Sequence, residues 1–209
     1  MSFYRAAKAG LARDTQVKID SQFDVDEAKK CLYWIAKISG EQIEIRDTDD
    51  KVEMADSFYT TLKDGVLLCK LIHTLLPEGH GIDFSKKTFQ QTKNLAFELA
   101  RERERIGMFL NKAQEYGVPV TNLFQTEYLY ERTNLVQVCT CIRAIGIEAQ
   151  SHPGYDGPVI WPKKNETNVR SFTTEQLNAG KQVISLQYGS NKGASQAGMN
   201  FGKTRNILD

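Results

Sequence analysis

The chain has 209 residues, 41% of them hydrophobic, which suits one domain of ordinary size plus extensions and argues against wholesale disorder. No run of side chains approaches the 18 apolar residues of a membrane span, and the first ten residues lack the apolar core of a signal peptide. The four cysteines lie inside apolar helical patterns, so we expect free, mostly buried thiols in a reducing, cytoplasmic setting.

The formal net charge of +1 conceals an uneven distribution. Residues 163–209 hold seven basic and three acidic side chains, whereas residues 1–162 hold 20 basic and 23 acidic ones. A nearly neutral body with a basic tail indicates an acidic partner for the tail. The tail lacks a run of Arg or Lys and has few aromatic side chains, so nucleic acid is a poor match.

The first predicted elements are a polar arm over residues 1–21, with a short helix near Leu11 to Ile19, and a longer amphipathic helix. Asp24 is placed to cap the longer helix, with Glu27 at the capping-box position, and Gly40 is a natural stop. Four apolar side chains recur on one face of this helix, with Trp34 beside them in the core: Val25, Ala28, Leu32 and Ile35.

The next stretch is charged and then strongly apolar. Residues 43–55 lack a clear period, and we interpret them as a surface loop. Residues 62–76 are apolar nearly all round, which predicts one buried central helix ended by Pro77. Gly65 inside that helix would cost about 1 kcal/mol relative to alanine, so we expect a close approach of another helix there.

Two further helices complete the predicted body. One runs from about Thr92 to Tyr116 and stops at Gly117, and its residues 101–105, which alternate Arg and Glu, are expected to form a solvated strip. The last helix is expected near residues 131–145, with Gly146 as its stop. Four principal helices with irregular joins predict an all-α globule with an extended, largely irregular C-terminal tail.

Beyond Gly146 the composition changes. Prolines and glycines concentrate between residues 152 and 162, which is typical of a linker, and a short helix is expected after Ser171 or Thr173. Residues 184–207 read ISLQYGSNKGASQAGMNFGKTRNI, in which five apolar side chains are scattered among glycines, amides, hydroxyls and three cations. Such a segment cannot bury enough apolar surface to fold alone, but it can lie along another protein.

This segment resembles the calponin-type repeat almost position by position, and the helical body resembles a calponin-homology (CH) domain. The CH resemblance rests on short motifs along the body: Glu27, Trp34-Ile35, KDGVLLCKLI at 63–72, Phe109-Leu110, FQT at 124–126 and LYE at 129–131. The chain therefore resembles the calponin and transgelin family. We expect an N-terminal arm over 1–21, a CH domain over 22–147, a linker over 148–180 and one repeat over 181–207.

The resemblance implies a cytoskeletal protein of muscle or motile cells that binds F-actin and cross-links or stabilises filaments, with the repeat as the main contact and the CH domain as a weaker one. Eight residues of the repeat are expected at the filament: Leu186, Lys192, Ser195, Gln196, Met199, Phe201, Lys203 and Arg205. Ser195 also resembles a regulatory phosphoacceptor, because added negative charge beside Lys192 would oppose binding to an acidic filament. A kinase and other cytoskeletal proteins are further candidate partners.

Other interpretations stay open at this stage. The chain could be a signalling or scaffold adaptor with incidental actin contact, it could bind microtubules, or the tail could pack back on the globule. Cys139-x-Cys141 lacks the second ligand pair of a zinc site, with one of the two thiols expected to face away from the core. Residues 47–50 lack the remaining ligands of a calcium loop, and no GxSxG, P-loop or HExxH motif occurs. We therefore expect no metal, no cofactor and no enzyme activity.

Overall fold

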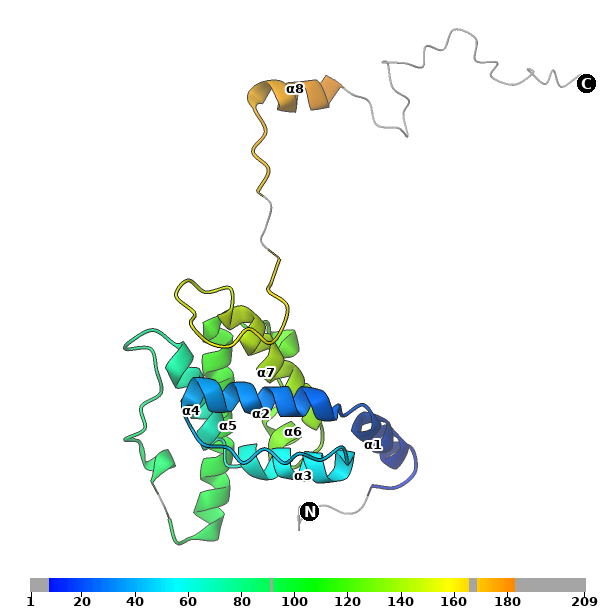
Figure 1. Ribbon diagram of the computed structural model, residues 1–209, viewed down its shortest axis with the longest axis vertical. Coiled ribbons are helices and arrows are strands. Elements are labelled where there is room, and N and C mark those ends of the chain that lie inside the picture. The colour runs from blue at the N-terminus through cyan, green and yellow to red at the C-terminus, as the bar shows by residue number, and fades with distance from the viewer. Residues whose placement is uncertain (1–7, 91, 166–168, 183–209) are drawn as a thin grey trace, which may run out of the picture. The chain divides into compact units, whose positions relative to one another are not determined.

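The computed structural model describes residues 8–90, 92–165 and 169–182, and these contain helices and no strand (Figure 1). The predicted all-α fold class is confirmed. The chain divides into two units, residues 1–164 and 165–209, which are described separately. The helices of the first unit are α1 (Leu11–Ser21), α2 (Val25–Ser39), α3 (Lys51–Leu62), α4 (Val66–Leu75), η1 (Lys87–Phe89), α5 (Leu95–Tyr116), η2 (Val120–Asn122), α6 (Thr126–Tyr130) and α7 (Leu135–Ala149).

The longer helices begin and end where local chemistry dictates. Asp24 caps α2, because its carboxylate accepts hydrogen bonds from the backbone N–H groups of Asp26 at 2.9 Å and Glu27 at 3.3 Å. Gly40, at φ +71°, ends α2, and Gly117, at φ +114°, ends α5. These three predictions from the sequence are confirmed.

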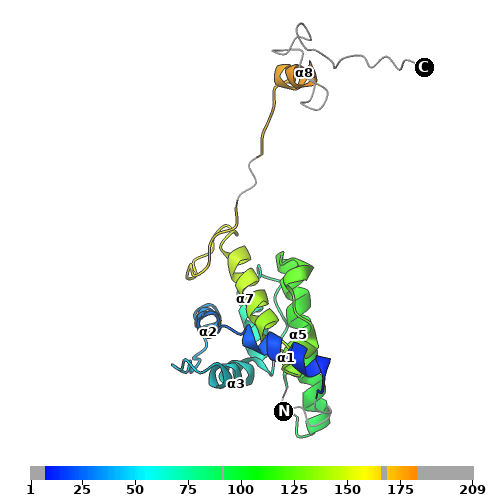
Figure 2. The ribbon, with the colours of Figure 1, turned by 90° about the vertical axis from the view of Figure 1, so that its right-hand side faces the viewer.

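The core of the first unit forms where α2 and α3 cross the direction of α5 and α7 (Figures 1 and 2). Trp34, Phe58 and Phe109 are the largest fully buried side chains, and the predicted burial of Trp34 is confirmed. All four cysteines are free and buried, where mostly buried thiols were predicted. The core therefore draws on side chains from most of the length of residues 23–161.

The apolar run at residues 62–76 does not form one continuous helix. It contains the last residue of α3, a turn and the whole of α4. α3 ends at Leu62 and α4 begins at Val66, with Gly65 between them at φ +73°. A Cβ atom on Gly65 would lie 3.0 Å from Cβ of Arg105 and 3.1 Å from the backbone nitrogen of Ile106, so the expected close approach of another helix is found.

The loop predicted over residues 43–55 gives way to α3 from Lys51 onward. Asp50 caps this helix, because its carboxylate accepts a hydrogen bond from the backbone N–H of Val52 at 2.8 Å. Met54, Phe58 and Leu62 follow at intervals of four residues and are fully buried. This helical stripe begins within the charged stretch, which is why the charge pattern alone indicated a loop.

The charged strip at residues 101–105 of α5 is not a solvated face. Glu102 and Arg105 are only 8% and 3% exposed. The guanidinium of Arg105 donates to the backbone oxygens of Asp64 at 2.6 Å and Thr88 at 3.0 Å, and to the Glu98 carboxylate at 2.7 Å. Burial raises the pKa of the Glu102 carboxyl group. Arg105 therefore joins the start of α4, η1 and the first turn of α5.

The last helix also differs from its prediction. Residues 126–130 form the separate helix α6, and α7 continues through Gly146 to Ala149. A Cβ atom on Gly146 would lie 2.3 Å from a ring carbon of Trp161. Gly146 therefore makes room for a side chain from the following segment and does not end the helix.

The described part of the second unit contains α8 (Thr174–Gln182), a helix that the sequence predicts. The hydroxyl of Thr173 accepts a hydrogen bond from the backbone N–H of Gln176 at 3.4 Å, and the Gln176 amide oxygen accepts one from the backbone N–H of Thr173 at 3.0 Å. This reciprocal pair is a capping box and sets where α8 begins. Within the part of the chain that the structure describes, no helix is both long and apolar enough to cross a membrane.

Candidate functional site

The residues predicted to contact a filament fall outside the part of the chain that the structure describes: Leu186, Lys192, Ser195, Gln196, Met199, Phe201, Lys203 and Arg205. The structure shows instead how the globule ends before that segment. Residues 150–164, here called the C-terminal strap, follow α7 and belong to the first unit. The strap occupies part of the range that composition assigned to a linker.

Trp161 anchors the strap to the globule. Its side chain is 5% exposed, its ring lies 5.5 Å from that of Trp34 in an edge-to-face arrangement, and it fills the space above Gly146. The indole Nε1–H donates a hydrogen bond of 2.8 Å to the Glu27 carboxylate at the start of α2. Because the indole is both packed and hydrogen-bonded, the strap joins α2 to α7.

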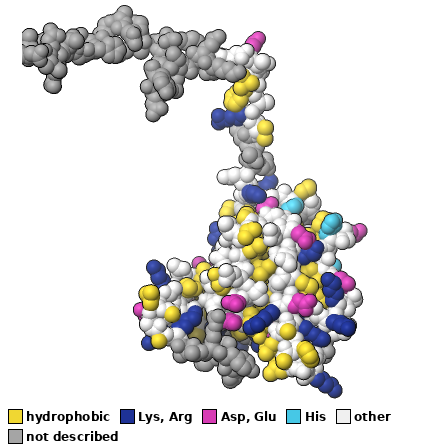
Figure 3. Space-filling model, turned by 180° about the vertical axis from the view of Figure 1, so that it is seen from behind, with side chains coloured by type: hydrophobic (Ala, Val, Ile, Leu, Met, Phe, Trp, Pro, Cys, Tyr) yellow, Lys and Arg dark blue, Asp and Glu magenta, His cyan; other side chains and the backbone are white. Residues whose placement is uncertain are grey.

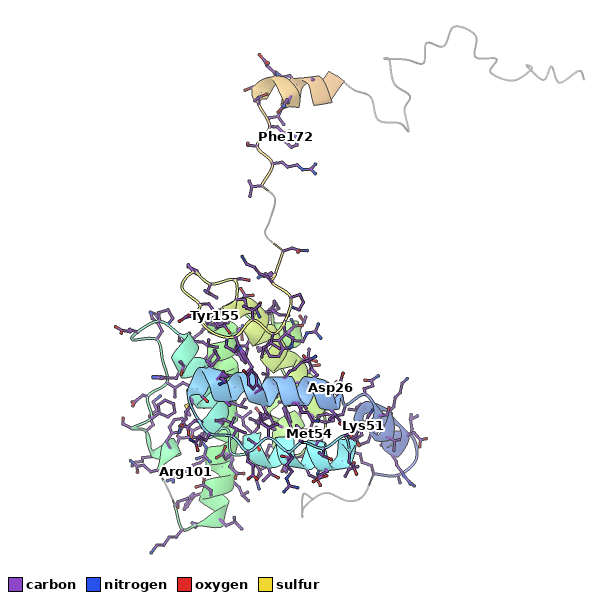
Figure 4. All side chains as sticks on the ribbon, in the orientation of Figure 1. Asp26, Lys51, Met54, Arg101, Tyr155 and Phe172 are labelled. Carbon is purple, nitrogen blue, oxygen red and sulfur yellow. The ribbon has the colours of Figure 1, made fainter. Side chains whose placement is uncertain are left out.

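Tyr155 forms a second anchor on the loop beside α2 (Figure 4). Its hydroxyl oxygen accepts a hydrogen bond of 2.9 Å from Nε1 of Trp34 and donates one of 3.0 Å to the backbone oxygen of Pro158. The ring of His152 stacks on that of Tyr116 at 4.6 Å. The prolines and glycines thus allow the strap to turn tightly over the core. Its aromatic side chains were the feature of the sequence that indicated packing.

The strap ends with an ion pair. Nζ of Lys164 lies 3.0 Å from the carboxylate of Glu148 near the end of α7. The first unit therefore runs to Lys164, beyond residue 147, where the CH domain was expected to end. A shorter connection raises the effective concentration of a second binding contact.

Charge is separated on the surface of the globule. Residues 41–56 carry seven acidic and two basic side chains, and we call this stretch the acidic segment. Much of its charge is paired, for example in the ion pairs Lys29–Asp47, Lys70–Glu41 and Arg46–Glu53. Lys86, Lys87 and Lys93 are exposed on the loop around η1, and Leu95 and Phe97 follow at the start of α5.

We call the second of these regions the lysine surface: Lys86, Lys87, Lys93, Leu95, Phe97 and Arg101. No motif in the sequence predicted this surface. Its signal in the sequence was present only in part, as three lysines within eight residues without an intervening acidic residue.

Two buried thiols of the globule have raised pKa values. Burial raises the pKa of the Cys69 and Cys141 thiols to about 12, so both stay protonated and unreactive at neutral pH. Cys139 and Cys141 are both buried, whereas one of them was expected to face away from the core. Among the described residues, no three His, Cys, Asp or Glu side chains are grouped so that they could hold a metal ion.

Comparison with known proteins agrees with this architecture. The family model of the calponin homology (CH) domain matches residues 25–150, and that of the calponin family repeat matches residues 184–207. Myophilin of Echinococcus granulosus is 38% identical over 201 residues, which are 96% of each chain. The crystal structure of the calponin-homology domain of Rng2 from Schizosaccharomyces pombe covers 78% of this chain and 87% of its own, with 25% identity and a TM-score of 0.48.

The matched family models place the chain in the class of CH-domain proteins. With its repeat and its similarity to myophilin, the chain belongs to the calponin and transgelin family. It is accordingly an actin-associated protein of the cytoskeleton. The resemblance stated from the sequence is thereby confirmed.

Proposed function

We propose that the chain binds along the side of actin filaments through the repeat at residues 184–207, and that it cross-links or stabilises them in the cytoplasm. The observation that carries the proposal is the repeat itself, which holds Lys192, Lys203 and Arg205 and no acidic side chain. Cations in an apolar and amide-rich segment suit an acidic protein surface. The globule adds a weaker contact that orients the molecule.

The connection between the two contacts supports this division of roles. The strap holds the chain to the globule as far as Lys164, and the repeat match begins at residue 184. About 20 residues can span at most roughly 65 Å, and less where α8 is helical. A second contact on so short a connection meets the same filament at high effective concentration, so two weak contacts yield a much tighter one.

Removing residues 181–209 tests the proposal. We expect the shortened chain to bind filaments at least about tenfold more weakly than the full chain, because the tethered contact is lost. Co-sedimentation with F-actin over a range of salt concentrations measures the effect. The control replaces Arg13, Lys18 and Lys30, which are exposed cations of α1 and α2, with glutamine. Equal pelleting of the full and shortened chains would contradict the repeat as the main contact.

We further propose that Ser195 is a regulatory phosphoacceptor in the repeat. A phosphoserine adds roughly two negative charges next to a cluster that faces an acidic partner. Ser195→Asp is therefore expected to raise the Kd for F-actin about threefold or more, whereas Ser195→Ala leaves it unchanged. The two variants are compared by co-sedimentation at low and physiological salt. If Ser195→Asp pellets as tightly as the parent, this regulatory role is wrong.

A further inference from the structure

The lysine surface lies where the loop around η1 meets the start of α5. Arg101 donates a hydrogen bond to the backbone oxygen of Gln90, which holds this loop against the helix (Figure 4). Phe97 precedes Arg101 by four residues and therefore lies on the same face of α5. Figure 3 shows hydrophobic side chains and Lys or Arg side chains next to one another at the lower end of the globule.

The part of the loop that carries Lys86 and Lys87 is held to the globule by contacts of residues 82–89. Nδ1 of His73 accepts a hydrogen bond of 3.0 Å from the backbone N–H of Ile82, and the ring of Phe84 lies 5.1 Å from that of His73. Phe89 packs on Phe84 at 4.8 Å, and the backbone oxygen of Thr88 accepts a hydrogen bond from the buried Arg105. These contacts hold residues 82–89 in place, which lowers the conformational entropy that a contact through Lys86 and Lys87 would lose.

The positive charge of this surface is only partly offset from within the globule. Lys86, Lys87 and Lys93 form no ion pair with any described residue, whereas cations such as Lys29 and Lys70 do. Two acidic side chains are near in sequence: Asp83, which interacts electrostatically with Lys86, and Glu98. Asp83 accepts hydrogen bonds from the hydroxyl and the backbone N–H of Ser85, which lower the pKa of its carboxyl group.

The second acidic neighbour, Glu98, is half-buried and is paired with the buried Arg105. Its carboxylate accepts the 2.7 Å hydrogen bond from the guanidinium of Arg105. The three lysines therefore present their charge outward, where it attracts an acidic partner within about one Debye length, roughly 8 Å at physiological ionic strength.

Apolar side chains accompany these cations. Leu95 is 71% and Phe97 is 61% exposed, although both occupy the first turn of a well-ordered helix. Exposed apolar side chains bordered by charge are typical of a protein–protein contact, in which an aromatic side chain serves as the anchor and the charges form the rim.

We propose that the lysine surface is the globule's own binding site for the acidic side of an actin filament, with Phe97 as its apolar anchor. This inference rests on the proposed function and adds the residues of the second contact. The positive charge of the three lysines favours the orientation in which this face meets the acidic filament. The slightly acidic net charge of the body is therefore no obstacle, since the local charge at the contact governs binding.

The test reverses three charges in the full chain. K86E/K87E/K93E is expected to raise the Kd for F-actin at least about tenfold and to flatten its dependence on salt. The matched control R13E/K18E/K30E removes the same charge from exposed positions on α1 and α2, and it should raise the Kd less than about threefold. Amide hydrogen exchange of residues 86–101 with and without filaments adds a direct readout, with protection expected on binding.

A second variant tests the apolar part. L95S/F97S is expected to weaken binding about fivefold at every salt concentration with an unchanged melting temperature, whereas V52S/V120S, at residues 67% and 66% exposed, leaves binding unchanged. The inference is overturned if K86E/K87E/K93E pellets like the parent, or if R13E/K18E/K30E loses as much. It is also overturned if K86E/K87E/K93E pellets normally but no longer binds phosphatidylserine vesicles, because the surface would then serve a membrane.

The two proposals fail in different ways. If the full parent chain does not pellet with filaments, the proposed function is wrong and the lysine surface falls with it. If the parent pellets with filaments and the lysine-surface variants pellet equally well, the filament function stands and this site alone is wrong.

Discussion

Replacing Arg105 with alanine is expected to lower the free energy of unfolding by about 4 kcal/mol, because breaking a buried charged pair leaves its partner uncompensated. The guanidinium is 3% exposed and donates to the backbone oxygens of Asp64 and Thr88 as well as to Glu98. Alanine would leave two carbonyl groups without their donor and a cavity where the side chain lies beside Gly65. Urea unfolding measures the loss, which corresponds to a melting temperature roughly 10 °C lower.

Arg105→Lys separates charge from geometry. Lysine keeps the positive charge but offers a single ammonium group where the planar guanidinium contacts three acceptors, so we expect it to recover only about half of the loss. Arg103→Ala is the matched control on the same helix. Arg103 is half exposed, with a 3.8 Å ion pair to Glu131 and its guanidinium over the ring of Tyr130, and its loss should cost less than about 1 kcal/mol. Equal losses for the two alanine variants would show that Arg105 is not a structural hub.

Arg105 also shows what the sequence pattern could have revealed. Ile106, Phe109 and Ala113 mark the buried face of α5 and stand at helical spacing in the sequence. Counting back along the same helical face leads to Arg105 and Glu102, so the register indicated burial while the alternation of charges suggested solvent. Besides Glu98 in α5, the hydrogen-bond partners of Arg105 are Asp64, in the turn between α3 and α4, and Thr88 in η1, which no local pattern can place.

The glycines also differ in whether their role depends on local or on distant residues. Gly40 and Gly117 end helices for a reason that lies in their own backbone, and their roles were predicted correctly. Gly146 looked identical in the sequence, but its role depends on Trp161, which lies 15 residues further along the chain. A residue whose role is set by a distant partner cannot be assigned from a local pattern.

The same distinction between local and distant causes applies to the two parts of the candidate site, the repeat and the lysine surface. The repeat was identified because its composition and order of residues are distinctive, and the match at 184–207 confirms its family. The lysine surface was missed, because its parts belong to a loop and to a helix start whose proximity depends on the fold. The exposure of Leu95 and Phe97 could not be predicted either, since apolar residues at a helix start are equally consistent with the core.

Replacing Trp161 with alanine is also expected to lower the free energy of unfolding by about 4 kcal/mol. The indole is buried, contacts Trp34 edge to face and donates a hydrogen bond to Glu27. Without it the strap loses its main anchor, and the connection to the repeat lengthens from about 20 to about 35 residues. Because effective concentration falls with roughly the −3/2 power of length, filament affinity should drop only about twofold. Urea unfolding and co-sedimentation measure the two effects on the same protein.

The contact between Trp161 and Gly146 is expected to reverse the sign of the stability change caused by Gly146→Ala. Alanine in place of glycine inside a helix normally stabilises by about 1 kcal/mol. At Gly146 the added methyl group would lie 2.3 Å from the Trp161 ring, so Gly146→Ala should destabilise the parent by about 2 kcal/mol. In the Trp161→Ala background that clash is gone, and the same substitution should stabilise.

Gly107 in α5 is the matched control for this cycle, since nothing lies within 4 Å of a Cβ atom built there. Gly107→Ala should stabilise both the parent and the Trp161→Ala variant by about 1 kcal/mol. The four combinations at Gly146 and Trp161, measured by urea unfolding, then yield a coupling energy of about 3 kcal/mol, which additive sites would not show. If Gly146→Ala has the same sign in both backgrounds, Trp161 does not pack on α7 in solution, and the strap is not held to the globule in the way described.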